Sequence, residues 1–496
     1  KNNLAPEDYA YRNIHFPESG AAYNRAKFRL IYDKLLAFQY SVLYNRRILD
    51  EECGNSKIAP VDIGKFLESL PFRLTLGQQS AIDDIEHDLM NTRAMNRLVQ
   101  GDVGCGKTVV AETAIFHAVS AGWQAAFMAP TEILARQHFA KLSVDFAKFG
   151  MRTALLISGL KSAERREILA GISNGDIDII VGTHALIQSD VEFAKLGLVI
   201  TDEQHRFGVN QRNKLREKGF LGNLLVMSAT PIPRSLALSI YGDLDLSIID
   251  ELPPGRTPIK TKWIANDEDL EKMYNFIYKK VNDGNQAYFV APLIETSDKM
   301  ALKSVDKVSE EIERKFSNKK IGIIHGKMKA KEKDEVMLKF KNKEYDILIA
   351  TTVIEVGIDV PTSTIMTIYN AERFGLSALH QLRGRVGRGS KQSYCFLISN
   401  STTENSKQRL SIMEETEDGF RIAEEDLKLR NSGEIFGLRQ SGFSDLKFID
   451  IIYDVKTIKL VRDECIKYLK EHKGEIENIY LKYDIEQKFS DIQAGN

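Results

Sequence analysis

The stretch that decides the fold is Gly101-Asp102-Val103-Gly104-Cys105-Gly106-Lys107-Thr108. It matches the spacing G-x-x-x-x-G-K-[ST] in full, between an apolar run at residues 97–100 and a helical pattern that begins at residue 109. In that context Gly101, Gly104 and Gly106 let backbone N–H groups curl around a phosphate, which the start of the helix also attracts. The stretch therefore predicts a phosphate-binding loop, the P-loop, within an α/β domain.

Two side chains at the end of the P-loop suit a magnesium-bound triphosphate. Lys107 is placed to reach the β- and γ-phosphate oxygens of ATP, and the hydroxyl of Thr108 is placed to ligate Mg²⁺. The alternative is a glycine loop that arises by chance, and the strand before the loop and the helix after it argue against that. We therefore expect ATP and Mg²⁺ as cofactors.

An acidic pair follows another apolar run, at residues 198–201. Asp202 stands at the end of a predicted strand, where a carboxylate can hold the magnesium shell. Glu203 is the expected general base for the attacking water, because neighbouring side chains at a strand end point in different directions. Surface turns often carry such a pair, so the signal is strong only together with the P-loop upstream in the same sheet.

Apolar runs alternate with helical stretches along most of the chain, a pattern typical of a parallel sheet with helices on both faces. The runs lie at residues 97–100, 125–129, 177–181, 198–201 and 224–227, and after a Pro/Gly-bearing linker at 251–258 they restart at 287–291, 321–324, 347–351, 364–369 and 394–398. Residues 20–49 predict one long helix, and from residue 405 the chain becomes helical and charged. We expect a linker at 1–69, two α/β lobes at 70–252 and 259–402, and a helical domain at 403–496.

Composition excludes few classes of function. The chain of 496 residues is 43% hydrophobic and 28% charged. Its net charge of −1 neither supports nor excludes nucleic-acid binding, which needs only a local basic surface. No run approaches about 18 apolar residues and no signal-peptide pattern is present, so we expect a cytoplasmic protein. The four scattered cysteines predict buried thiols in a reducing compartment, and the first residue, which is not Met, predicts a fragment or a processed chain.

A basic segment in the second lobe supplies the cation that the first lobe lacks. Residues 380–389 read HQLRGRVGRG and place Arg383, Arg385 and Arg388 between glycines. Guanidinium groups suit the planar recognition of phosphate oxygens, so we expect Arg385 and Arg388 to reach across the cleft to ATP as arginine fingers. The alternative is a basic patch that binds nucleic acid.

In their order these motifs resemble superfamily 2 helicases, and in their wording they are similar to the RecG family of branched-DNA helicases. The segments that carry the resemblance are FRLTLGQ at 72–78 (Q motif), APTEILA at 129–135 (motif Ia), GTHAL at 182–186 (motif Ib), DEQHRFGV at 202–209 (motif II), SATPIPR at 228–234 (motif III), IHGKM at 324–328 (motif IV), TTVIEVGIDVP at 351–361 (motif V) and 380–389 (motif VI). Residues 429–442 resemble the family's translocation hairpin and loop, except that Asn431-Ser432 stands where the family usually has Gly-Pro and Leu438 where it usually has Thr. The resemblance extends from residue 15 to the tail and implies that the family's N-terminal wedge domain is not part of this sequence.

The resemblance also implies residue roles. It implies two RecA-like lobes around MgATP, a helical C-terminal translocation domain, and further nucleotide contacts from Phe72, Gln78, Gly357 and Asp359, with Gln78 at the base. The residues implied in contact with DNA or in coupling are Thr131, Arg136, Thr183, His184, His205, Ser228, Thr230, His325, Thr351, Thr352, Arg430, Arg439 and Gln440. Each threonine at a strand end can instead cap the following helix, and both readings stay open. For His205 a hydrogen-bond relay to the other lobe is preferred to a metal ligand, since no second His or Cys stands at ligand spacing.

The implied function is an ATP-dependent DNA helicase or translocase that acts on branched DNA, such as stalled forks and Holliday junctions, in recombination and repair. Hydrolysis of ATP to ADP and phosphate would open the cleft, ratchet the lobes along one strand and let the tail element pull duplex. The expected partners are branched double-stranded DNA and a single-stranded DNA-binding protein, and the expected state is a monomer without membrane contact. A transcription-repair translocase and a DEAD-type RNA helicase are disfavoured by the wording of residues 202–209, and a non-catalytic P-loop switch by the presence of Glu203, Arg385 and Arg388.

Overall fold

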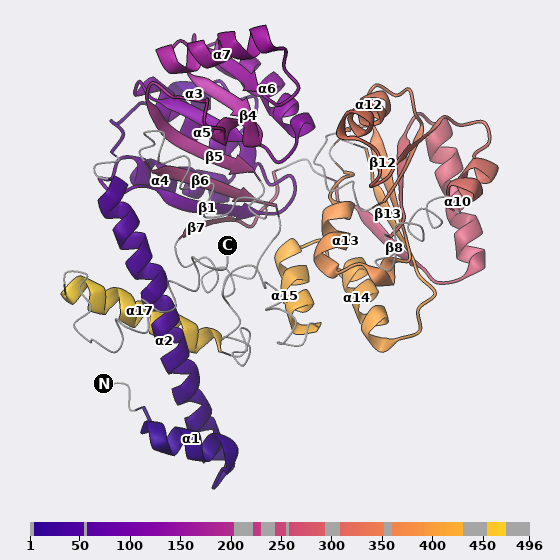
Figure 1. Ribbon diagram of the computed structural model, residues 1–496. Coiled ribbons are helices and arrows are strands. Elements are labelled where there is room, and N and C mark those ends of the chain that lie inside the picture. Colours follow the sequence, from indigo (N-terminus) through magenta and orange to yellow (C-terminus); the bar gives the residue numbers. More distant parts are fainter. Residues whose placement is uncertain are drawn as a thin grey trace.

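The computed structural model describes residues 4–53, 57–202, 222–229, 244–253, 257–292, 308–351, 360–387, 389, 391–429 and 454–472. Figure 1 shows two α/β lobes, and a long helix, α2, that leads away from the first of them. Both lobes contain a parallel sheet, as the alternating apolar runs predict, so the predicted fold class is confirmed. No helix within these ranges combines the length and the apolar character of a membrane span.

The first lobe is built on a sheet with strand order β3-β4-β2-β5-β6-β1-β7, in which every pair of neighbours is parallel. Its strands are β1 (Asn96–Gly101), β2 (Gln124–Met128), β3 (Thr153–Leu156), β4 (Ile179–Gly182), β5 (Leu196–Asp202), β6 (Asn223–Ser228) and β7 (Asp245–Ile249). The five inner strands read as continuous apolar runs because helices cover both faces of a parallel sheet. The sequence analysis missed β3 and β7, which lie at the two edges and are only partly buried.

Helices connect the strands of the first lobe and cover its two faces (Figure 1). They are α3 (Gly64–Glu68), α4 (Leu76–Leu89), α5 (Lys107–Ser120), α6 (Glu132–Ala147), α7 (Ser162–Asn174) and the short 3-10 helix η1 (His184–Ile187). Helix α5 is buried along nearly its whole length, from Val109 to Val119. It therefore fixes the P-loop, which ends at its first turn, against the middle of the sheet.

The second lobe has the strand order β10-β11-β9-β12-β13-β8, again with only parallel neighbours. Its elements are β8 (Lys260–Ile264), α10 (Asp267–Asn282), β9 (Gln286–Val290), β10 (Ile321–Ile324), α12 (Ala330–Lys341), β11 (Ile347–Ala350), β12 (Ser363–Tyr369), the 3-10 helix η4 (Ala371–Arg373), α13 (Leu376–Arg383) and β13 (Tyr394–Ile398). Strand β8 was not predicted from the sequence; it is an edge strand in which exposed and partly buried positions alternate up to the buried Ile264. An edge strand needs no continuous apolar run, so the pattern that reveals the inner strands is absent there.

The remaining helices join the two ends of the chain. They are α1 (Glu7–His15), α2 (Gly20–Cys53), α14 (Glu404–Glu415), α15 (Gly419–Leu429) and α17 (Val455–Glu471). Helix α2 confirms the predicted long helix, and α17 packs across it (Figure 1). An apolar cluster of Ile31, Leu35, Ile458 and Val461 fills that crossing, with Leu427 from α15 at its side. The N-terminal and C-terminal helices thus share one core.

Candidate active site

The P-loop has the backbone that its glycines predict. Gly104 and Gly106 have φ values of 82° and 88°, in the left-handed region that favours glycine. A Cβ atom on Gly106 would lie 2.2 Å from Nε2 of Gln78, so only glycine lets the loop approach helix α4 this closely. Lys107 extends its Nζ back over the loop and donates to the carbonyl oxygens of Gly101 and Asp102, at 2.8 Å each. The loop therefore forms a tight cradle with its cation at the rim.

Gln78, the predicted base contact, is fixed to the P-loop by its own amide. Its Oε1 accepts from the backbone N–H of Thr75 at 2.9 Å, and its backbone N–H donates to Thr75 Oγ1, which completes a capping box at the start of α4. Its Nε2 donates to the carbonyl oxygen of Cys105 at 2.8 Å. Phe72, just before this turn, is 52% exposed. Gln78 thus holds α4 and the P-loop together, and Phe72 is an accessible aromatic group of the segment.

The other predicted catalytic groups of the first lobe lie at the same edge of the sheet. All strands are parallel, so β1, β5 and β6 end side by side and place the P-loop, Asp202 and Ser228 along one rim. Thr108 lies in the first turn of α5, which packs against β5. Hydroxyl and carboxylate oxygens are hard donors that suit Mg²⁺ when phosphate and water oxygens complete the shell. Thr108 and Asp202 therefore fit a magnesium ion that arrives with a nucleotide.

His138 on α6 is a functional candidate that the sequence analysis missed. Its Nε2 lies 3.3 Å from Oδ2 of Asp202, and its ring packs on Phe127 of β2 with centroids 4.5 Å apart. The next turn of α6 carries Lys141, which pairs with the buried carboxylate of Glu112 on α5. Burial raises the pKa of Glu112 above its usual value, and Lys141 opposes that shift. No spacing in the sequence connects residue 138 with residue 202; only the packing of α6 on the sheet does.

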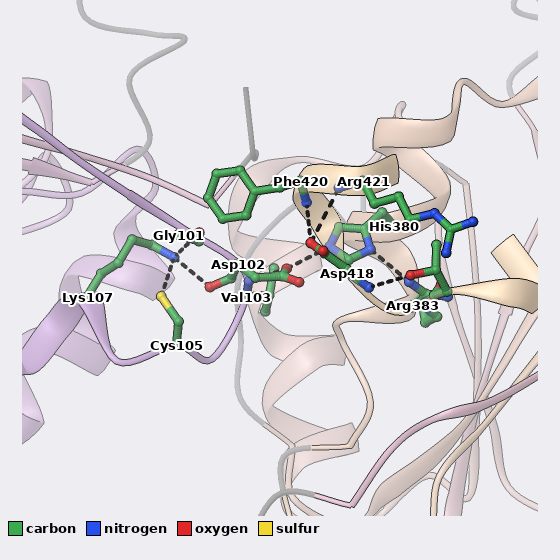
Figure 2. A network of polar contacts seen from close by, with 11 residues as sticks. Gly101, Asp102, Val103, Cys105, Lys107, His380, Arg383, Asp418, Phe420 and Arg421 are labelled. Atoms are coloured by element: carbon green, nitrogen blue, oxygen red, sulfur yellow. Dashed lines mark hydrogen bonds and ion pairs between the residues drawn. The ribbon is translucent and has the colours of Figure 1, made fainter. Parts of the chain in front are cut away.

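The second lobe touches the P-loop directly. His380 on α13 places its Nε2 2.6 Å from Oδ1 of Asp102, as Figure 2 shows. One turn further on, a Cβ atom on Gly384 would lie 3.0 Å from Cβ of Val103, so the chain here packs closely against the P-loop. Arg385, a predicted arginine finger, follows at once and is buried. Of the predicted catalytic groups, Lys107 and Asp202 lie on one rim of the first lobe and Arg385 follows the glycine that packs on the P-loop, whereas Glu203 and Arg388 lie outside the described residues.

Arg383 has a different role from that of a surface patch. Its side chain is 1% exposed, and its NH1 donates to the carbonyl oxygens of Met413 and Thr416 at 2.8 and 2.9 Å. Its NH2 lies 3.0 Å from Nδ1 of His380 (Figure 2). This guanidinium ties α13 to the end of α14, so it is no part of a nucleic-acid-binding surface.

The predicted DNA-contacting residues divide by lobe. In the first lobe, Thr131 caps α6 by accepting from the N–H of Leu134 at 3.4 Å, Thr183 is buried before η1, and Arg136 and His184 are exposed. In the second lobe, His325 and Thr351 follow the adjacent strands β10 and β11. The buried Nδ1 of His325 and Oγ1 of Thr351 have no hydrogen-bond partner among the described residues. The predicted residues that lie outside those residues are His205, Thr230, Thr352, Gly357, Asp359, Arg430, Arg439 and Gln440.

Three protein families match successive parts of the chain. Residues 75–238 match the DEAD/DEAH box helicase family, and residues 268–390 match the helicase conserved C-terminal domain. Residues 416–485 match domain 3, C-terminal, of the ATP-dependent DNA helicase RecG. The first two families cover the two lobes with the P-loop and the arginine segment, and the third covers the helical tail.

Curated relatives and a solved structure agree with these matches. The chain is 48% identical to the ATP-dependent DNA helicase RecG of Streptococcus pneumoniae over 470 residues, which covers 93% of this chain and 69% of that protein. It is also 48% identical to RecG of Thermotoga maritima, over 94% of this chain and 60% of that protein. The structure of RecG bound to a three-way DNA junction superposes with a TM-score of 0.78 at 43% identity, over 93% of this chain and 62% of that chain. The chain therefore spans between three fifths and about two thirds of the length of these relatives.

Proposed function

The chain belongs to the RecG family of ATP-dependent DNA helicases, and we propose that its two lobes bind MgATP between them and use the hydrolysis to move along branched DNA. The observation that carries this proposal is the contact between the P-loop of the first lobe and the arginine segment of the second, at Asp102 and His380. A site divided between two lobes lets nucleotide binding and release change their relative position. Such a change is what a translocating motor requires.

Each group of the proposed site has one task. Lys107 binds the β- and γ-phosphates, and Arg385 and Arg388 stabilise the charge that develops on the γ-phosphate. Glu203 accepts the proton of the attacking water, and Asp202 and Thr108 hold Mg²⁺, which when bound neutralises the β- and γ-phosphate oxygens. Phe72 and Gln78 hold the adenine end, and the bond from Gln78 to the carbonyl oxygen of Cys105 fixes that end to the P-loop. The buried position of Arg385 beside Gly384 supports its assignment as a finger.

A DNA path along the rim of the lobes completes the proposal. Thr131, Thr183 and His184 in the first lobe and His325 and Thr351 in the second follow the carboxyl ends of parallel strands, and Arg136 lies near the start of α6, the helix that Thr131 caps. Hydroxyl, imidazole and guanidinium groups there can track phosphates without reading bases. The capping bond of Thr131 uses one lone pair of its hydroxyl, so its O–H remains available to a phosphate.

The substrate and the setting follow from the relatives. We propose forks and Holliday junctions as substrates, because a structure similar to this chain holds a three-way junction. Opening one base-pair step costs about 1.4 kcal/mol, but fork reversal forms as many base pairs as it breaks, so the motor mainly supplies direction. Action as a monomer, in the cytoplasm, and together with a single-stranded DNA-binding protein belongs to the same proposal.

ATP hydrolysis measured with no nucleic acid, single-stranded RNA, linear duplex DNA and a model fork tests the function. Stimulation by DNA and not by RNA is expected, and Lys107→Ala is expected to abolish it because the phosphates lose their cation. Stimulation mainly by RNA would replace the proposal with an RNA helicase. Equal, slow hydrolysis in all four reactions would favour a nucleotide-dependent switch.

A further inference from the structure

We infer that His380 is a positioning residue for ATP hydrolysis: through its hydrogen bond to Asp102 it fixes the start of the arginine segment against the P-loop. The inference rests on the proposed function, since it concerns the same site, and it assigns a role to a residue pair that the motif comparison left unassigned. The pair consists of a carboxylate within the P-loop and an imidazole on α13, at 2.6 Å (Figure 2).

The partners of His380 determine which of its nitrogens carries the proton. A guanidinium group only donates, so Nδ1 of His380, 3.0 Å from NH2 of Arg383, has to accept. Nε2 then carries the hydrogen and donates to Oδ1 of Asp102. The ring is held at both ends, between an anion of the first lobe and a cation of the second.

Asp102 is suited to receive that bond. Burial alone would raise the pKa of its carboxyl group, but the hydrogen bonds from His380 and from the backbone N–H of Val103, together with Lys107, lower it below the usual value. Oδ1 accepts from Val103 N at 2.6 Å and from His380 Nε2. One oxygen atom therefore shapes the P-loop turn and holds the other lobe.

The other end of the relay is anchored in the second lobe. Arg383 donates to the carbonyl oxygens of Met413 and Thr416, close to the C-terminal end of α14. Asp418, two residues later, accepts from the backbone N–H groups of Phe420 and Arg421 and so caps the start of α15. The imidazole of His380 thus rests on a buried guanidinium group that is itself fixed by charge-assisted bonds, and it has little freedom to turn away from Asp102.

Backbone hydrogen bonds connect His380 to the predicted arginine finger, Arg385. Gly384 N donates to the carbonyl oxygen of His380 at 2.9 Å, and Arg385 N donates to that of Leu382 at 3.1 Å. These bonded turns make residues 380–385 one unit, and the close packing of Gly384 on Val103 presses that unit onto the P-loop. A shift of about 1 Å in a group that stabilises the transition state can lower a rate by about a hundredfold, so this docking bears on hydrolysis.

A double-mutant cycle on Asp102 and His380 tests the inference. Asp102→Ala, His380→Ala and the double variant are assayed for DNA-stimulated ATP hydrolysis and for binding of a fluorescent ADP analogue with Mg²⁺. We expect kcat to fall by about tenfold to a hundredfold in His380→Ala, and by no more in the double variant than in Asp102→Ala, because the contact is already lost in Asp102→Ala. KM and the affinity for the analogue are expected to stay within about twofold in His380→Ala, since Lys107 and the bond from Val103 N to Asp102 that shapes the P-loop turn remain.

Conservative and matched variants separate positioning from general damage. Asp102→Asn keeps the oxygen that accepts both bonds, and His380→Gln keeps a donor near the position of Nε2, so both are expected to recover most of the rate. Ser377→Ala is the control: it removes the 2.9 Å bond from α13 to Asp426 on α15, on the same helix but within the second lobe. It is expected to keep kcat within about twofold.

A second readout does not depend on activity. Dyes on Lys161→Cys and Lys391→Cys, two exposed positions on different lobes, report the inter-lobe distance by energy transfer in a Cys53→Ser background. His380→Ala is expected to broaden the distance distribution and Ser377→Ala to leave it unchanged. Additive losses in the cycle, or an unchanged distribution in His380→Ala, overturn the inference. If DNA does not stimulate ATP hydrolysis by the unmodified chain, but His380→Ala still broadens the distance distribution, the proposed function is refuted and the docking role of His380 is not.

Discussion

Asp102 and His380 are 278 residues apart in the sequence and 2.6 Å apart in the structure. The first belongs to the P-loop of one lobe and the second to the arginine segment of the other, so the nucleotide-binding loop is itself part of the contact between the lobes. A second contact lies further along the rim, where Ile133 of α6 packs against the core of the second lobe. There Glu132 raises and Arg136 lowers the pKa of Asp334 on α12, with burial as the largest cause of a net rise. The lobes therefore meet at two places, the P-loop with α13 and the start of α6 with the second lobe.

Removal of the predicted arginine finger should lower the rate of ATP hydrolysis more than its replacement by another cation does. Arg385→Ala is expected to lower kcat for DNA-stimulated ATP hydrolysis by about 10³-fold or more, with nucleotide binding little changed. Arg385→Lys keeps the charge but loses the planar pair of donors, so its kcat should lie between that of Arg385→Ala and that of the unmodified chain. The measurement is kcat and KM for both variants with a model fork. Rates within tenfold of the unmodified chain for Arg385→Ala would assign the finger elsewhere.

His138 should increase the affinity of the nucleotide site for Mg²⁺. Loss of the group that orients a metal-ligating carboxylate commonly weakens metal affinity by about 10–100-fold. His138→Ala frees Oδ2 of Asp202, now 3.3 Å from the imidazole, and is expected to raise the Mg²⁺ concentration needed for half-maximal binding of a fluorescent ADP analogue. His138→Gln, which keeps a donor, should recover part of the effect. Arg136→Ala, an exposed change on the same helix, is the control for that magnesium dependence, and an equal rise in both variants would contradict the role.

Sequence reasoning reached the fold because its decisive signals are local. The inner strands are apolar runs, and the capping box of Thr75 and Gln78 and the P-loop are written in consecutive residues. The edge strands β7 and β8 were missed because polar residues interrupt their apolar ones, whereas the edge strand β10 was predicted from its apolar run. The edge strand β3 was missed although residues 154–156 are apolar.

The candidate site was reached only in part for a related reason. Motifs gave Lys107, Thr108, Asp202 and Arg385, whose chemistry is fixed by residue type and spacing. His138 and the partner of His380 depend on which helices meet, and no spacing encodes that. Arg383 shows the limit most clearly, because its place among arginines and glycines fitted a basic patch, whereas its burial makes it a structural tie.

The crossing of α2 and α17 should be needed for stability. Leu35 is 2% exposed in the cluster that joins the two helices, and Leu35→Ala is expected to lower the free energy of unfolding by about 2–5 kcal/mol. Urea unfolding followed by circular dichroism measures the change, and hydrogen exchange shows whether it is confined to these helices. Leu460→Ala is the control, because Leu460 is 40% exposed on α17. Equal losses for the two variants would mean that the cluster does not hold the ends together.

Glu112 predicts a dependence of stability on pH with a definite sign. Burial raises the pKa of its carboxyl group in the folded chain above the usual 4.5, so its contribution to stability is full below that value and is lost as pH rises through the folded-state pKa. Glu112→Gln mimics the protonated form and does not ionise. The free energy of unfolding of the variant relative to the unmodified chain should therefore increase between about pH 4.5 and pH 8, measured by urea unfolding. Lys141→Met removes the cation that opposes the rise in the pKa of Glu112, so the loss of stability should continue to higher pH in that variant. A difference that stays constant with pH would show that Lys141 fully compensates the burial of Glu112.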